Sequence, residues 1–173
     1  TWLAGSTHSL SWFGNDPDGD ALVYGVSYSN DGGGSWDLLV SGLTTTTFSI
    51  DVDALAGGSD VRFRVLATDG VNTVYDETAD AISVPNKAPV PTISNPTTGQ
   101  LFAPGALAVL NGNAADLEDG SLPGASLHWS SNVMGGLGTG TSLPMAGLTP
   151  GAHLITLTAI DSNGLASSVS VPI

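Results

Sequence analysis

Two acidic loops hold the side chains with the most distinctive chemistry in the sequence. The first loop, residues 15–20, reads Asn-Asp-Pro-Asp-Gly-Asp, and a distant strand-like run ends at Asp69 before a glycine. The arrangement returns in the second half, where an acidic loop opens at Asp116 and another run ends at Asp161. Carboxylates from separate segments are hard oxygen ligands for a divalent cation. The candidate metal ligands are Asp16, Asp18, Asp20, Asp69, Asp116, Glu118, Asp119 and Asp161.

Calcium fits these carboxylates better than other metals do. Ca²⁺ takes six to eight oxygen ligands, which backbone carbonyls and water would complete, whereas zinc or copper would call for His or Cys. The second set has fewer aspartates, because Ser121 replaces the third carboxylate and Glu118 is longer. A purely structural interpretation stays open, since Asp-Pro-Asp-Gly is also an ordinary turn in which Asp16 and Asp18 cap backbone N–H groups.

The charge balance favours cations as partners. Sixteen acidic residues face three basic ones, for a net charge of -13, and all but two of the acids are Asp. This charge argues against nucleic-acid or anionic-membrane partners. A high-salt habitat is an alternative cause of the acidity. With no Cys, disulfides and thiolate metal sites are excluded.

The chain begins at Thr1 without a signal peptide, and no apolar run approaches the length of a membrane span. We therefore expect it to be a piece of a longer polypeptide.

Strand-like alternation predicts an all-β fold. In residues 61–67, Val61, Phe63 and Val65 share one face and both arginines share the other. The same phase recurs 92 positions later in residues 153–159. With 23 Gly, 10 Pro and no helical period, the spacing of turns is typical of a β-sandwich. Further strands are expected at 8–13, 22–29, 36–40, 46–52 and 74–84, and at 92–95, 107–113, 127–131, 142–145 and 165–173.

The repeat divides the chain into two domains. Asp16 and Asp116 are 100 positions apart, and residues 84–91 form a stiff linker with three prolines. We therefore predict one domain at 1–85 and a second at 86–173. The first departs from the pattern because only residues 1–7 are available for an opening strand.

Several phrases resemble tandem bacterial immunoglobulin-like modules of the fibronectin type III-like, cadherin-like and PKD-like kind. They are Asp-Pro-Asp-Gly-Asp at 16–20, Ala-Thr-Asp-Gly at 67–70, Asn-Lys-Ala-Pro at 86–89, Leu-Thr-Pro-Gly-Ala-His at 148–153 and Ala-Ile-Asp-Ser-Asn-Gly at 159–164. The resemblance implies two immunoglobulin-like β-sandwiches in a secreted or cell-surface protein, with neighbouring modules of the same polypeptide as partners. In such a sandwich the acidic loops of each half lie at one end. A calcium ion beside the linker would stiffen a non-catalytic spacer or interaction module.

An accessory module of a secreted hydrolase, binding glycan or protein, is the alternative function. Trp2 and Trp36 are its candidate contacts, because we expect Trp12 and Trp129 to be core. Residues 29–36 resemble one Asp-box hairpin, which as a single copy indicates a structural turn under Trp36. Catalysis by paired carboxylates is not expected, because these acids lie in exposed glycine-rich loops without an apolar wall. His153 is expected to take the hydrogen-bonding place of a tyrosine corner.

Overall fold

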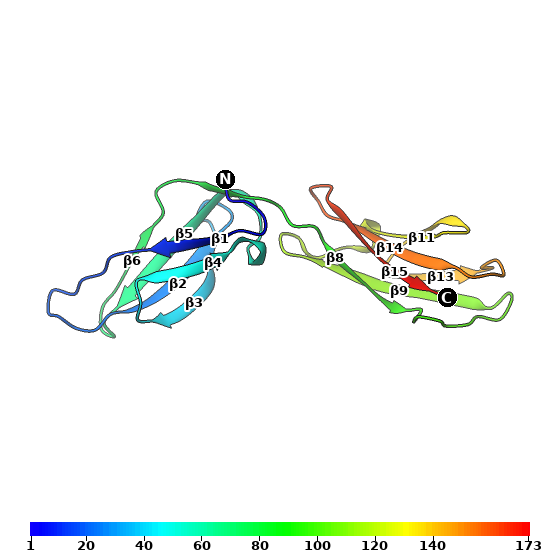
Figure 1. The fold of residues 1–173 in the computed structure, drawn as a ribbon, viewed down its shortest axis with the longest axis horizontal. Coiled ribbons are helices and arrows are strands. Elements are labelled where there is room, and N and C mark those ends of the chain that lie inside the picture. Colours follow the sequence, from blue (N-terminus) through cyan, green and yellow to red (C-terminus); the bar gives the residue numbers. More distant parts are fainter. The chain divides into compact units, whose positions relative to one another are not determined.

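The computed structural model describes all residues, 1–173, as an all-β chain of two compact units (Figure 1). Unit 1 is Thr1–Asn86 and unit 2 is Lys87–Ile173, so the division falls one residue beyond the predicted boundary. The helical segments are two short 3-10 turns, η1 (Val52–Ala54) and η2 (Gly124–Ser126). None is long and apolar enough to cross a membrane.

Unit 2 is a sandwich of two antiparallel sheets. One sheet places β9 between β8 and β13, with the short β10 also paired to β9. The other has the order β12-β11-β14-β15. The strands of the first sheet are β8 (Val90–Asn95), β9 (Leu107–Asp116), β10 (Gly120–Ser121) and β13 (Ser142–Ala146). Those of the second are β11 (Leu127–Ser131), β12 (Gly135–Thr139), β14 (Leu154–Ile160) and β15 (Ala166–Pro172).

The sheets of unit 2 close over an apolar core centred on Trp129, which is 1% exposed. Its indole Nε1–H donates to the Gly140 carbonyl at 2.8 Å, so the one polar atom of the ring is satisfied. Leu110, Leu127, Ile155 and Leu157 pack in the same cluster. The predicted core position of Trp129 is confirmed.

Unit 1 has a smaller first sheet. That sheet contains only β1 and β4, while the second has the order β3-β2-β5-β6, with β7 also paired to β5. The first-sheet strands are β1 (Thr7–Ser11) and β4 (Thr47–Asp51). Those of the second are β2 (Val23–Ser29), β3 (Asp37–Leu43), β5 (Gly58–Thr68), β6 (Thr73–Glu77) and β7 (Ile82–Val84).

The alternation predicted for β5 explains its two faces. Val61 and Phe63 are buried among Val26, Ile50 and Val52. On the opposite face Arg64 pairs with Glu77 at 2.7 Å, and Arg62 pairs with Asp60 within its own strand. The burial of one face against the β1–β4 sheet therefore follows the period-two pattern of the sequence.

Two predictions for unit 1 need correction. The strand expected at 74–84 is broken into β6 and β7, because Thr78 turns inward: its N–H donates to the Phe63 carbonyl and its hydroxyl accepts the Phe63 N–H. Trp12, expected in the core, is only partly buried at its margin, edge-on to Tyr24. Its indole Nε1 is shielded from solvent without a hydrogen-bond partner.

Candidate functional site

The acidic loop of unit 2 begins where β9 ends. Asp116 is the last residue of β9, and its Oδ1 accepts the N–H groups of Glu118 and Asp119, both at 2.9 Å. Gly120 follows in the left-handed region at φ 70°, which lets the chain turn back into β10. The loop is thus folded around one oxygen of the Asp116 carboxylate.

The loop that follows β14 lies directly beside it. The Asp119 carboxylate accepts the Ser162 N–H at 2.7 Å and the Ser162 hydroxyl at 2.8 Å, and these bonds hold the pKa of Asp119 below its usual value. Asp161 Oδ1 in turn accepts the N–H groups of Asn163 and Leu165. Two segments more than forty residues apart in sequence therefore bring their carboxylates to one end of unit 2.

The first residue of unit 2 joins the same end. The backbone N–H of Lys87 lies 3.2 and 3.3 Å from the two carboxylate oxygens of Glu118. The acidic loop thus contacts the segment that leads into β8, which pairs Val90 with Ala115 next to Asp116. Anything that binds the loop would also act on the start of the unit.

One carboxylate oxygen in this cluster has no partner. Asp116 and Asp161 are only 7% and 6% exposed, and Asp116 Oδ2 is shielded from solvent without a hydrogen bond. An unpaired charged oxygen in a buried position lowers the free energy of unfolding by about 2 kcal/mol or more unless a cation or a proton compensates its charge. Among the acidic groups of the chain, this oxygen has the clearest need for a positive partner.

No group of three or more His, Cys, Asp or Glu side chains has the geometry of a metal site in this structure. Each predicted ligand of this unit instead accepts hydrogen bonds from backbone N–H groups near it: Asp116, Glu118, Asp119 and Asp161. Their predicted role as metal ligands stays a prediction, and an ion would need to draw their remaining oxygens together.

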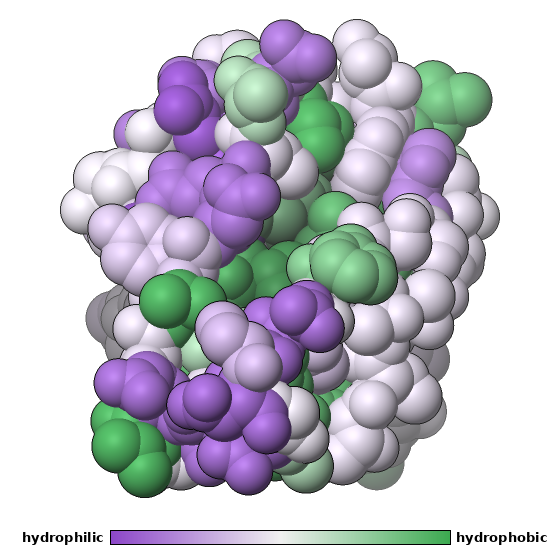
Figure 2. Space-filling view, turned by 90° about the vertical axis from the view of Figure 1, so that its left-hand side faces the viewer, coloured by the Kyte–Doolittle hydropathy of each residue, from purple (hydrophilic) through white to green (hydrophobic).

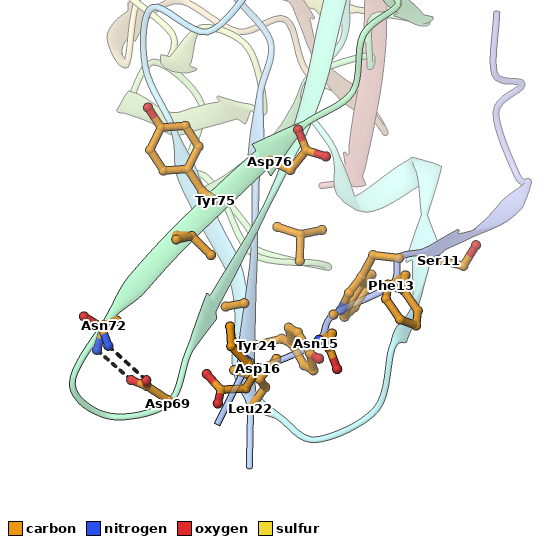
Figure 3. Close-up of a pocket in the computed structure, with 16 residues that line it drawn as sticks. Ser11, Phe13, Asn15, Asp16, Leu22, Tyr24, Asp69, Asn72, Tyr75 and Asp76 are labelled. Atoms are coloured by element: carbon orange, nitrogen blue, oxygen red, sulfur yellow. Dashed lines mark hydrogen bonds between the residues drawn. The ribbon is translucent and has the colours of Figure 1, made fainter. Parts of the chain in front are cut away.

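The acids of unit 1 cap their own turns. Asp16 Oδ1 accepts the N–H groups of Asp18 and Asp20, and Asp69 Oδ1 accepts those of Val71 and Asn72. The Asn72 and Val71 N–H groups lower the pKa of Asp69. Figure 3 shows the hydrogen bonds between Asn72 and Asp69. Asp16 and Asp69 line one hollow, whereas Asp18 and Asp20 do not line it. The turn interpretation accounts for these contacts, and metal binding by the four residues stays a prediction.

The hairpin at 29–36 is the structural turn that the sequence indicated. Asp31 accepts the Ser29 hydroxyl at 2.7 Å and the N–H and hydroxyl of Ser35. Trp36 donates its Nε1–H to the Gly33 carbonyl, and the Arg64 guanidinium lies 4.0 Å from its ring centroid. A cation covers one face of this tryptophan, so the structure adds nothing to its predicted role as a glycan contact.

Acid should weaken this hairpin. The Ser29 hydroxyl, followed by the N–H and hydroxyl of Ser35, lowers the pKa of Asp31 from 3.8 to about 2. Because the folded pKa is depressed, the stabilisation is complete above pH 3.8 and is lost as the pH falls through about 2. A carboxyl-detected NMR titration should show Asp31 titrating well below 3.8, and an Asp31 titration at or above 3.8 would contradict the geometry.

His153 has the hydrogen-bonding place predicted for it. The ring is buried, with Nδ1 2.8 Å from the Ser131 hydroxyl and Nε2 2.7 Å from the Thr149 carbonyl. Both nitrogens are engaged within the fold, so His153 is a structural residue.

Sequence reasoning missed one feature, an apolar hollow of about 670 Å³ in unit 1. It opens between the segment after β1 and the β5–β6 hairpin (Figure 3). Figure 2 shows hydrophobic residues in its floor and hydrophilic ones around it. The lining includes Trp12, Phe13, Tyr24, Val74 and Tyr75, with Asp16, Asp69 and Asp76. The signal that could have located it is the missing opening strand of the first half.

Comparison with known proteins supplies a fold likeness only. No family model matches the chain, and no curated protein matches it. Among solved structures it is similar to fibronectin(III)-like modules of Clostridium thermocellum CbhA, at 18% identity and a TM-score of 0.45, covering 98% of this chain and 85% of that one.

Two animal structures are similar over comparable lengths. The chicken interferon gamma receptor alpha chain matches at 14% identity and a TM-score of 0.36, covering 95% of this chain and 92% of that one. The FN1–FN3 domains of chicken CNTN1 match at 10% identity and a TM-score of 0.32, covering 97% and 63%. The assignment of function therefore rests on the residues described above.

Proposed function

We propose that this chain is a non-catalytic spacer or interaction module of an extracellular protein, and that Ca²⁺ binds at the acidic end of unit 2. The observation that carries the calcium site is the buried, unpartnered Oδ2 of Asp116. A cation is the partner that such an oxygen lacks, and the surrounding side chains offer further hard oxygens.

The ion would be held by Asp116 together with Asp161, with Glu118 and Asp119 next to them. Asp119 already connects the two loops through Ser162, so both loops lie side by side at this end of unit 2. Backbone carbonyls and water would complete the shell, as calcium sites allow. The ion would also offset the mutual repulsion of four acidic residues in a chain of net charge -13.

Binding would order the start of unit 2. Because the Lys87 N–H contacts Glu118, fixing the loop fixes the segment between Lys87 and β8 as well. This segment contains Pro89, whose ring is buried, and lies within the proline-rich linker of residues 84–91. The function of the ion is therefore mechanical: it limits the freedom of the chain between neighbouring modules.

Substitution of Asp116 by asparagine tests the site. Asn keeps the Oδ1 acceptor that caps Glu118 and Asp119 and replaces Oδ2 by an uncharged amide. In chelator, we expect D116N to unfold at or above the temperature of the wild type, because a buried charge is removed. With Ca²⁺ at one hundred times its dissociation constant, the wild type should gain about 2.7 kcal/mol while D116N gains little.

Calorimetric melting of both proteins with and without Ca²⁺ makes the measurement. D80N is the matched control, because it removes one exposed aspartate charge outside the cluster and should keep the full calcium response. Equal calcium responses in the wild type and D116N would refute the site, and so would a wild type that does not respond.

A further inference from the structure

The hollow in unit 1 lies where unit 2 has an additional strand. The two units align at an offset of 100 across this region. The Ser6 N–H donates to the Leu3 carbonyl, and the Ala106 N–H donates to the Ala103 carbonyl. The N–H groups of Trp12 and Gly112 donate to the carbonyls of Thr46 and Thr141, which directly precede β4 and β13. Gly5 and Gly105 have φ values of 71° and 76°. The strands β1 and β9 are therefore equivalent, position for position.

Unit 2 shows what covers this position. The strand β8 pairs antiparallel with β9, joining Val90 to Ala115, Thr92 to Asn113 and Asn95 to Asn111. It also contacts β14 and β15, and the Ser167 hydroxyl donates to the Pro89 carbonyl. Alternate residues of β8, including Pro91 and Ile93, are partly buried, and Ile93 packs on the core.

Unit 1 has no such strand. β1 pairs with β4 alone, and it ends at Ser11, whereas the equivalent β9 continues to Asp116. Residues 12–15 belong to no strand. The Trp12 N–H points toward Thr46. Backbone N–H and C=O groups point to alternate sides of an extended chain, so those of Ser11 and Phe13 face the open edge, away from β4.

The residues that line the hollow are equivalent to those that surround β8 in unit 2, a position that we call the seat of β8. Residues 11–15, which line it, correspond to residues 111–115, which pair with β8. On the other wall, Val74 pairs with Ala67 as Ser167 pairs with Ala159, so Val74 and Tyr75 lie where unit 2 has Ser167 and Ser168. Figure 3 shows Phe13 and Tyr75 on opposite sides of this opening. The hollow is thus an unfilled strand position with apolar walls.

The charge around the hollow defines the occupant further. Asp16, Asp69 and Asp76 line it, and no basic residue does. In unit 2, the residue that leads into the equivalent strand near the acidic loop is Lys87, the single lysine of the chain. An occupant that matches both walls and charge is an extended strand with apolar residues at alternate positions and a basic residue at its amino end.

We propose that unit 1 binds a peptide strand of this kind, supplied from outside residues 1–173, antiparallel to β1 in the seat that β8 fills in unit 2. Backbone hydrogen bonds along 11–15 would give affinity, and the apolar walls would select alternate side chains. The proposal does not depend on calcium and concerns a different unit from the calcium site.

A synthetic peptide with the sequence of residues 87–95, Lys-Ala-Pro-Val-Pro-Thr-Ile-Ser-Asn, is the probe. Added to the isotope-labelled full chain, it should shift the NMR signals of residues 11–15 and 74–76 and leave those of β8 and β9 unchanged. Replacing its lysine by glutamate should weaken binding. Shifts confined to unit 2, or equal binding of the two peptides, would overturn the proposal.

Matched variants locate the site. Phe13 and Val71 are each 90% exposed in unit 1, but only Phe13 lines the hollow. F13D should weaken peptide binding by roughly tenfold or more, because a single aromatic contact is worth about 1.5 kcal/mol. V71D adds the same charge beside the hollow and should stay within about twofold of the wild type.

A fusion removes any dependence on peptide affinity. Residues 87–100, placed directly ahead of Thr1, would supply the strand at the offset seen in unit 2. We expect the amide protons of Ser11, Phe13 and Asn15 to become protected from hydrogen exchange, the melting temperature of unit 1 to rise, and the free peptide to stop binding. Unchanged exchange at all three amides would overturn the proposal even if the free peptide binds elsewhere.

Discussion

Truncating Trp129 to alanine should destabilise unit 2 by about 3–5 kcal/mol, the largest loss expected for any single side chain of this unit. The indole is 1% exposed and packs in the core with Leu127, Ile155 and Leu157. Its removal leaves a cavity and an unpaired carbonyl on Gly140, which now accepts the indole N–H. Denaturant unfolding followed by near-ultraviolet circular dichroism would measure the change.

The variant Trp129→Phe separates the two causes. Phenylalanine keeps most of the apolar volume but loses the hydrogen bond to Gly140, so its cost should be well below that of alanine. The transition of unit 1 should stay in place in both variants, because its core is a separate cluster around Phe63 and Val26. Equal losses for alanine and phenylalanine would show that the hydrogen bond, not packing, dominates.

Adding one methyl group at Gly112 should cost about 1–3 kcal/mol. A Cβ there would lie 2.6 Å from Leu157 Cδ2, 2.8 Å from the Thr92 carbonyl oxygen and 3.1 Å from the Trp129 ring. The Thr92 contact is the strictest, because it is backbone of β8 and cannot rotate away. Gly112→Ala should therefore loosen the β8–β9 pairing, which hydrogen exchange at residues 111–115 would report.

Gly136→Ala is the matched control for this substitution. Gly136 lies in β12 with nothing within 4 Å of its Cβ position and without a positive φ. There the same change should leave stability equal or slightly higher, since alanine restricts the unfolded chain. A Gly112→Ala variant as stable as Gly136→Ala would show that unit 2 adjusts its strand spacing freely.

The architecture could be predicted from the sequence because the same alternation of apolar and polar residues occurs at equivalent positions in both halves. The alternation in 61–67 and its copy at 153–159 correctly predicted paired strands with one buried face, and the offsets marked equivalent loops. The tandem β-sandwich fold is confirmed by the sheets of both units.

The sequence of one half did not predict which large side chain fills its core, because that depends on how much room the facing residues leave. The equivalent of Trp12 in unit 2 is Gly112, and the equivalent of Trp129 in unit 1 is Val26, which pairs with Val65 as Trp129 pairs with Leu157. The large ring thus comes from different sheets in the two units, and it lies at the margin of the core in unit 1 and in its centre in unit 2. In unit 2, Gly112 leaves room that the Trp129 ring fills, because a Cβ at position 112 would lie 3.1 Å from that ring.

The acidic sites show a second limit. The resemblance to immunoglobulin-like sandwiches predicted that the loops of each half lie at one end, and the contact between Asp119 and Ser162 brings those of unit 2 together. The offsets did not show that each aspartate would first satisfy neighbouring backbone N–H groups. Nor did they distinguish Asp116, with its unpaired buried oxygen, from Asp16, whose loop lies beside the open strand seat.

Isothermal titration calorimetry of the full chain with Ca²⁺ tests the calcium site most directly. We expect one binding event that D116N abolishes and D80N preserves, with a dissociation constant of about 10⁻⁴ to 10⁻³ M, the range of extracellular calcium modules. Absence of heat in the wild type at several millimolar Ca²⁺, or undiminished binding by D116N, would contradict it.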